Sequence, residues 1–214
     1  MGSGNVLYLA LEDNERRLVE RVGRIQKGEE VSEEFRVRFT SSRLPKLIEE
    51  LEEKRKTSDP KLVIIDTLQM IREPVKNTEN LYAYVYRKMA MLKKFADKND
   101  IAIIATHHTR KVNDTSNVFN NISGTTGIMG AADSNFVLNK DKEKVVLSVT
   151  GRDISSEKYL LSFDKDTCLW SMEETKEVEM ESMLLESFGA VRSCVCLGML
   201  NFLTRRRQAR YSRK

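Results

Sequence analysis

The chain has 214 residues, of which 40% are hydrophobic and 32% are charged, a composition that fits one globular domain with appended segments. No run reaches the roughly 18 apolar residues of a membrane span, and no signal-peptide pattern opens the chain, so neither is expected. The three cysteines, Cys168, Cys194 and Cys196, do not make a disulfide framework. We therefore expect a cytoplasmic protein.

The formal net charge of +4 comes from the end of the chain. From Ala190 onward there is no acidic residue, whereas seven are basic: Arg192, Arg205, Arg206, Arg207, Arg210, Arg213 and Lys214. The rest of the chain is mildly acidic, so the overall charge does not indicate that the body binds nucleic acid. A tail that contacts phosphates through its arginines is one interpretation, and an unstructured, solvated tail is the favoured one.

Apolar strands and helices alternate along the first half of the chain. Apolar runs predict strands at residues 6–11, 62–65 and 101–106, an alternating pattern predicts one at 35–39, and helices are expected from Asp13, from Ser41 and over 81–98. Continuous apolar strands separated by helices are typical of a parallel sheet that is covered on both faces. The fold class is therefore α/β, with three layers and a mostly parallel, twisted sheet.

The second half contains a polar stretch and then more strands. Residues 110–126 lack an apolar period and indicate a long loop, and the glycine-rich residues 124–130 favour a helix that starts close to the sheet. Further strands are predicted at residues 135–138, 145–149 and 159–163. The core is assigned to residues 1–170, an acidic linker to 171–189 and a basic tail to 190–214.

Each of the three apolar strands ends on a polar group that is able to do chemistry. The first strand leads to Glu12, the second to Asp66, and the third to His107 and His108. Ligands of open α/β sheets bind outside the carboxyl ends of the strands. These side chains are therefore expected to lie around one cavity.

The two carboxylates have both chemical and structural interpretations. Asp66 follows four apolar residues, which is typical of an aspartate that holds Mg²⁺ beside phosphates, although a strand-end aspartate also caps helices. Glu12 is placed to polarise an attacking water as a general base, although on its own helix capping is favoured. The two chemical interpretations gain weight together because both residues fall on the same edge of the sheet.

The histidines and one arginine are further candidates. Alternation along a strand predicts that one of His107 and His108 faces the cleft, where it would donate a hydrogen bond to a phosphate. Zinc is disfavoured because no cysteine has ligand spacing to them, and an ordinary polar strand end is the alternative. Arg152 follows another apolar strand, where either a phosphate-stabilising arginine for a neighbouring subunit or a solvated turn residue fits; spacing alone favours the turn.

No P-loop of the form G-x-x-x-x-G-K-[ST] occurs in these residues. The nearest pattern, residues 23–28 (GRIQKG), is followed by Glu29 and Glu30, whose charges would repel a triphosphate. We reject it as a phosphate-binding loop.

Five segments together resemble the AAA family ATPases of RecA-like fold. They are residues 7–13 (LYLALED), 62–71 (LVIIDTLQMI), 103–111 (IIATHHTRK), 123–127 (SGTTG) and 151–154 (GRDI). Within that family the chain is most similar to plasmid-replication RepA-type hexameric helicases, which are found on mobile elements. The resemblance spans residues 4–170.

The resemblance implies a role for each matching residue. Glu12 is similar to the catalytic glutamate, Asp66 to the Walker B aspartate that holds Mg²⁺, and His108, with His107 beside it, to the sensor of the γ-phosphate. Arg152 looks like the arginine that acts on a neighbouring subunit, a role that in some members lies near the position of Asp133. The family implies ATP and Mg²⁺ as cofactors, a hexameric ring, and single-stranded DNA contacted by residues 110–126.

The chain departs from the family at both ends. In the family a P-loop strand and helix precede the strand that here begins at Val6, and residues 190–214 look unlike the family's C-terminal region. A truncated or frame-shifted product would explain both, and weak or absent ATP binding is then expected. Two hypotheses remain: the ATPase core of a DNA translocase, or a non-catalytic remnant or binding module that retains the RecA-like fold.

Overall fold

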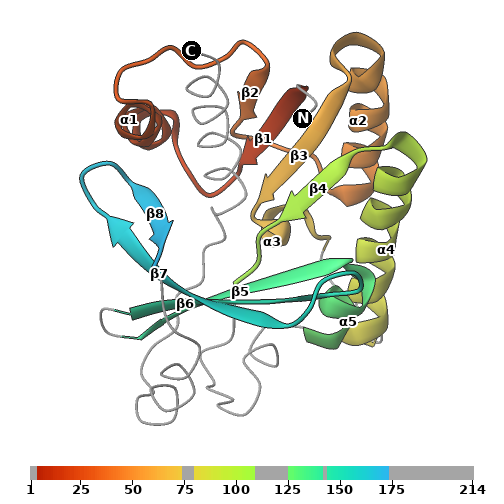
Figure 1. The fold of residues 1–214 in the computed structure, drawn as a ribbon. Helices are drawn as coiled ribbons and strands as arrows, with labels where there is room; N and C mark the ends of the chain where they lie inside the picture. The colour runs from red at the N-terminus through yellow and green to blue at the C-terminus, as the bar shows by residue number, and fades with distance from the viewer. Residues whose placement is uncertain (1–3, 74–79, 109–124, 142–143, 174–214) are drawn as a thin grey trace.

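A computed structural model describes residues 4–73, 80–108, 125–141 and 144–173, which form two four-stranded sheets (Figure 1). The first sheet is parallel, with strand order β2-β1-β3-β4. Its strands are β1 (Asn5–Ala10), β2 (Phe35–Arg38), β3 (Pro60–Asp66) and β4 (Ala102–Ala105). All four predicted strands of the first half are confirmed.

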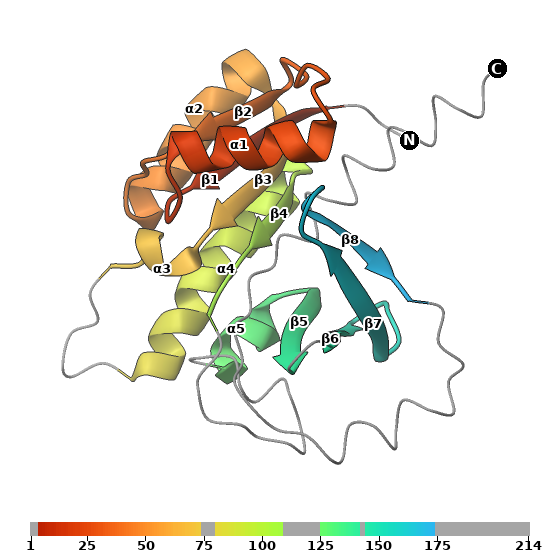
Figure 2. The ribbon, with the colours of Figure 1, turned by 90° about the vertical axis from the view of Figure 1, so that its left-hand side faces the viewer.

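Helices cover both faces of the parallel sheet, as Figures 1 and 2 show. They are α1 (Glu15–Gln26) on one face, and α2 (Leu44–Ser58) and α4 (Leu81–Asn99) on the other. Alternate residues of β1 serve the two cores: Tyr8 packs with Leu18 of α1, whereas Leu9 packs with Leu47 of α2. This alternation explains why β1 is apolar throughout and gives the three layers.

The ends of the helices follow the local sequence. The side chain of Asn14 caps α1 by accepting a hydrogen bond from the backbone N–H of Arg17, and a proline occupies the first turn of α2. A short helix, α3 (Leu68–Ile71), was not predicted. It lies at the carboxyl end of β3, where Leu68 and Ile71 are buried, and four residues are too few to show a helical period (Figure 1).

The second sheet is antiparallel, with strand order β5-β6-β7-β8. It follows α5 (Thr125–Ala131) and consists of β5 (Ser134–Asp141), β6 (Lys144–Gly151), β7 (Glu157–Asp164) and β8 (Leu169–Met172). Three of these strands and α5 were predicted, whereas β8 was not, because it is short and has no clear alternation. β8 is held by its ladder to β7 and by the contact between the rings of Phe163 and Trp170.

The α/β, three-layer prediction is confirmed, and the later strands add an antiparallel sheet to the parallel one. The acidic linker from residue 174, the basic tail and residues 110–124 of the predicted loop lie outside the described residues, and the last two residues of that predicted loop are the start of α5. Within the described ranges, no helix has the length and apolar character needed to cross a membrane.

Candidate active site

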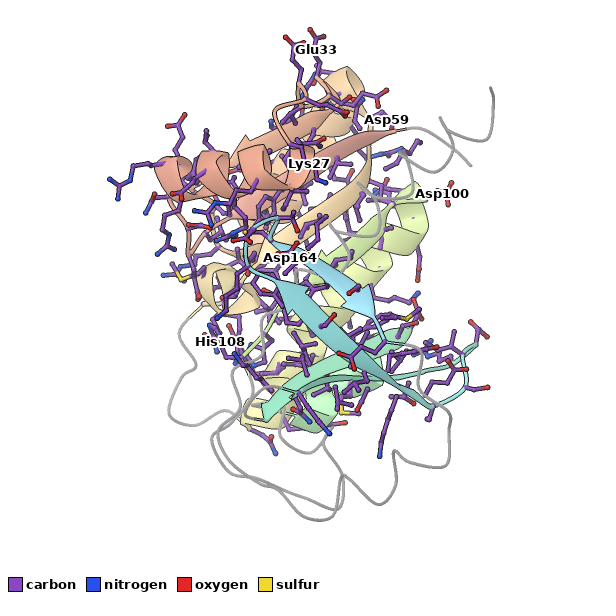
Figure 3. All side chains as sticks on the ribbon, turned by 60° about the vertical axis from the view of Figure 1, so that its left-hand side comes forward. Lys27, Glu33, Asp59, Asp100, His108 and Asp164 are labelled. Atoms are coloured by element: carbon purple, nitrogen blue, oxygen red, sulfur yellow. The ribbon has the colours of Figure 1, made fainter. Side chains whose placement is uncertain are left out.

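A pocket opens at the carboxyl ends of β1, β3 and β4. Its lining residues are Glu12, Asp13, Arg17, Arg21, Asp66, Thr67, Thr106, His107 and His108. The four residues predicted to meet around one cavity are all among them, and Figure 3 shows His108 at this end of the sheet. They meet because parallel pairing places Ala10 opposite Asp66 and Ile65 opposite Ala105, which aligns the three strand ends.

Glu12 lies in the pocket with both carboxylate oxygens engaged. The Thr67 hydroxyl donates to Oε1 at 2.7 Å, and His108 Nε2 lies 3.1 Å from Oε2. Burial raises the pKa of Glu12. The hydrogen bonds from Thr67 and His108, with the nearby imidazole, lower it by more than burial raises it, so the pKa lies below its ordinary value. A charged carboxylate only accepts, so Nε2 of His108 is the donor of this hydrogen bond.

Asp66 is fixed by two hydroxyl groups. Thr106 Oγ1 donates to Oδ1 at 2.7 Å, and the buried Tyr8 hydroxyl donates to Oδ2 at 2.9 Å. Each oxygen keeps a lone pair, so the carboxylate remains a hard oxygen donor held in one orientation. Mg²⁺ typically takes one or two carboxylates together with water and phosphate oxygens, and Asp66 fits that requirement.

The described residues contain no cluster of three or more His, Cys, Asp or Glu side chains able to hold a metal ion by themselves. The donor set at this pocket therefore does not resemble a closed structural metal site, which needs four protein ligands.

An ion-pair cluster at the edge of the pocket was missed by the sequence reasoning. Asp13, whose side chain is only 7% exposed, pairs with Arg17 Nε at 2.7 Å and with Arg21 Nη2 at 3.0 Å. Burial raises the pKa of Asp13, but the hydrogen bonds from Arg17 and the backbone of Asn14, with the charge of Arg21, lower it more. The sequence did contain a signal for this cluster, namely the spacing of four residues from Asp13 to Arg17 and from Arg17 to Arg21.

Three hydroxyl residues of the site were also missed. Thr67 and Thr106 are adjacent in sequence to predicted site residues, so their presence at the pocket was open to inference. Tyr8 lies inside an apolar strand, and no local pattern distinguishes its role from ordinary core packing. Only the pairing of β1 with β3 shows that its hydroxyl reaches Asp66.

The two histidines follow β4 directly. Both His107 and His108 line the pocket, and Nε2 of His108 contacts Glu12 there, while the prediction that one ring faces the cleft and the other points away stays a prediction. β4 ends at Ala105, so the alternation of a strand does not extend to them.

Arg152 is not brought to this pocket. It follows β6, its side chain is 60% exposed, and its Nη1 lies 3.4 Å from a carboxylate oxygen of Asp133. Its backbone N–H also donates to the carbonyl of Asp133. At Gly151, an added Cβ would lie 2.7 Å from that same carbonyl, so glycine allows this close approach.

A family model described as an AAA domain matches residues 1–114. The chain belongs to this AAA domain family. No curated protein matches its sequence. The predicted AAA and RecA-like character is confirmed, whereas the finer likeness to RepA-type helicases stays a prediction.

Two solved structures resemble this AAA domain. One is described as an ATPase domain; it has a TM-score of 0.62 and 18% identity over 80% of this chain and 75% of its own. The other, "The Structure Of A DnaB-Like Replicative Helicase And Its Interactions With Primase", has a TM-score of 0.61 and 18% identity, covering 78% of this chain and 50% of its own. At this identity the likeness shows the fold alone, and this AAA domain spans about half of the second chain.

Replacing Thr67 by Val is expected to raise the pKa of Glu12, because the substitution removes a hydrogen bond that favours the charged carboxylate. A carboxyl-detected NMR titration measures this shift. Because the pKa of Glu12 is lower in the folded state than in the unfolded state, its ionisation stabilises the fold at pH values above the ordinary glutamate pKa. That contribution is lost as the pH falls through the folded-state pKa. Thr106→Val, which affects Asp66 instead, is the matched control. An unchanged Glu12 titration in Thr67→Val would contradict the assignment.

Proposed function

We propose that this AAA domain carries hydrolytic residues of an ATP-driven motor that acts on single-stranded DNA. The observation that supports the proposal most strongly is the shared pocket of Glu12, Asp66 and His108 at the carboxyl ends of three parallel strands. Enzymes that cleave phosphoanhydrides work by positioning and by electrostatic stabilisation, and this pocket has fixed groups for both.

In this proposal, Glu12 accepts a hydrogen bond and then the proton from the attacking water. Its lowered pKa keeps it charged at neutral pH, and Thr67 fixes the direction of its lone pairs. Asp66 holds Mg²⁺, which when bound would neutralise charge on the phosphate oxygens. Thr106 and Tyr8 keep the Asp66 carboxylate in one orientation.

His108 and His107 supply hydrogen-bond donors toward the terminal phosphate. Because Nε2 of His108 also contacts Glu12, donation from Nε2 to the phosphate would free one oxygen of the base, and loss of the phosphate would restore the contact. This contact gives the pocket a direct link between the phosphate and the residue that orients water.

Arg152 is proposed to act on the pocket of a neighbouring subunit in a hexameric ring. Its exposure and its position outside the lining of its own chain's pocket support a role in trans, and Asp133 restrains its side chain. We also propose that residues 110–126 contact DNA, that the protein is cytoplasmic, and that it belongs to a mobile-element replication system of RepA type.

A second candidate, a non-catalytic module with the same fold, is supported by a sequence observation. These 214 residues contain no G-x-x-x-x-G-K-[ST] motif. The backbone amides and lysine of that loop supply most of the binding energy for a triphosphate. We propose that the residues for hydrolysis are present and that a P-loop must be supplied for them to work.

Calorimetric titration of this chain with ATP and Mg²⁺ is expected to give no binding heat, because the sequence contains no P-loop motif to supply an amide cradle and a lysine for the phosphates. A P-loop ATPase titrated under the same conditions is the positive control. A micromolar Kd for this chain would contradict the proposal that a P-loop must be supplied.

A further inference from the structure

Two adjacent acids lie where β1 leads into α1, and they have different partners. The carboxylate oxygens of Glu12 meet Thr67 and His108. Asp13 instead pairs with the guanidinium groups of Arg17 and Arg21, which are called the arginine pair below. Neighbouring carboxylates compete for the same cations, so the structure must determine which of the two acids the arginine pair binds.

Asp13 holds the arginine pair with both of its carboxylate oxygens. Oδ1 accepts from the backbone N–H of Asn14 at 2.9 Å and from Arg17 Nε at 2.7 Å, and Oδ2 lies 3.0 Å from Arg21 Nη2. The spacing of four residues places successive charged side chains one helical turn apart. The side chain of Asp13 is only 7% exposed, so salt screens these pairs less than it screens pairs in open solvent.

The arginine pair also lies beside Glu12. Both arginines line the pocket, and among the described residues that line it they are the only Lys or Arg side chains, set against three acids. Arg17 Nη2 lies 3.4 Å from the backbone carbonyl oxygen of Glu12. The Glu12 side chain is 37% exposed, so a guanidinium group that Asp13 released would have access to it.

Capture of the arginine pair by Glu12 would spoil a general base. A guanidinium group donates two parallel hydrogen bonds to a carboxylate, so it would occupy the lone pairs that a water molecule needs, and its charge would make the carboxylate a weaker base. Burial raises the pKa of both carboxyls. Thr67 and His108 then lower the pKa of Glu12, whereas the arginine pair and a backbone N–H lower the pKa of Asp13.

We propose that Asp13 is a positioning residue that keeps the arginine pair away from Glu12, so that the Glu12 carboxylate stays open to a water molecule. The adjacent acids then have separate tasks, because Asp13 neutralises the two cations and Glu12 accepts the proton. The inference rests on the proposed function, in which Glu12 is the base. The charged or titratable side chains around Glu12, among the described residues that line the pocket, are Asp13, Arg17 and Arg21 from the start of α1, Asp66 from β3, and His107 and His108 after β4.

A pH titration of Glu12 in the full 214-residue chain tests the inference without nucleotide. In Asp13→Asn the arginine pair loses its carboxylate and Glu12 is the acid beside it, so the pKa of Glu12 is expected to fall. The midpoint of the titration should move down by about 0.5 to 1 pH unit, because water weakens ion pairs of partly exposed guanidinium groups. Carboxyl-detected NMR measures the midpoint.

A double-mutant cycle separates capture by Glu12 from the simple loss of a nearby negative charge. Arg17→Gln/Arg21→Gln removes the arginine pair, and Asp13→Asn is then introduced into that background. The fall in the Glu12 midpoint should be larger when the arginine pair is present.

Two further variants serve as controls. Asp13→Glu keeps a carboxylate for the arginine pair and should keep the wild-type titration of Glu12. Asp59→Asn removes an exposed, ion-paired acid at the opposite end of β3, as Figure 3 shows, and should leave Glu12 unchanged. Circular dichroism confirms that each variant is folded. Wild type supplies a measurement that needs no variant, because the Nε–H signal of Arg17 should titrate with Asp13 and not with Glu12.

Several results would overturn the inference. A rise in the pKa of Glu12 in Asp13→Asn would mean that Asp13 only stabilises the start of α1, because Glu12 would then have lost its hydrogen bonds to Thr67 and His108. An unchanged midpoint, an equal fall in both backgrounds, or an Arg17 signal that titrates with Glu12 would also overturn it. The proposed function is judged separately: absence of ATP hydrolysis once a P-loop is supplied would overturn the motor proposal and leave the pairing of Asp13 standing.

Discussion

Replacing Glu12 by Gln is expected to lower ATP turnover by about 100- to 10,000-fold once a P-loop is supplied. The amide fills the same space and still accepts from Thr67, but it carries no charge and takes no proton from water. The protein to assay is a fusion in which the P-loop strand, loop and helix of a related ATPase precede Gly4. Steady-state phosphate release with single-stranded DNA measures turnover, and calorimetry measures ATP affinity.

The controls for this experiment separate chemistry from folding. Glu15→Gln, at an exposed acid in the first turn of α1, should leave turnover unchanged. ATP affinity should be similar in the fusion and in its Glu12→Gln variant, because a residue that acts only on the attacking water contributes to the transition state and not to ground-state binding. Turnover retained by Glu12→Gln would place the base elsewhere in the pocket.

Leu9→Ala is expected to destabilise the fold by about 2–5 kcal/mol. Leu9 is fully buried at 0% exposure in the central strand β1, opposite Ile65 of β3, so its removal leaves a cavity beneath the strand end that delivers Glu12. A single domain has only about 5–15 kcal/mol of stability in total, so the loss is a large fraction of it. Urea unfolding followed by circular dichroism measures the change.

Val19→Ala is the matched control for Leu9→Ala. Val19 lies on the outer side of α1 at 64% exposure, so its truncation removes little buried surface. Its effect should stay within about 0.5 kcal/mol. Equal destabilisation by the two substitutions would mean that β1 does not occupy the centre of the core.

Local patterns predicted the elements that have a strong period or a clear cap. The continuous apolar runs gave the parallel strands, and Asn14 and the proline of α2 marked the starts of helices. Elements of four residues, such as α3 and β8, escaped because so short a segment has no readable period. α3 is held by the hydrogen bond from the Leu68 N–H to the carbonyl of Thr106, which is distant in sequence, and β8 is held by its ladder to the neighbouring strand β7.

The sequence by itself determined that Glu12, Asp66 and the two histidines meet at the pocket, because parallel strands bring their carboxyl ends to one edge whatever their exact register. Only the tertiary structure decided their hydrogen-bond partners and the lowered pKa of Glu12. The hydroxyls of Tyr8, Thr67 and Thr106 reach their acceptors only because strand register and side-chain direction place the atoms within hydrogen-bond distance. Apolar burial is a pattern along one segment, whereas a hydrogen bond between strands depends on the distance between two atoms.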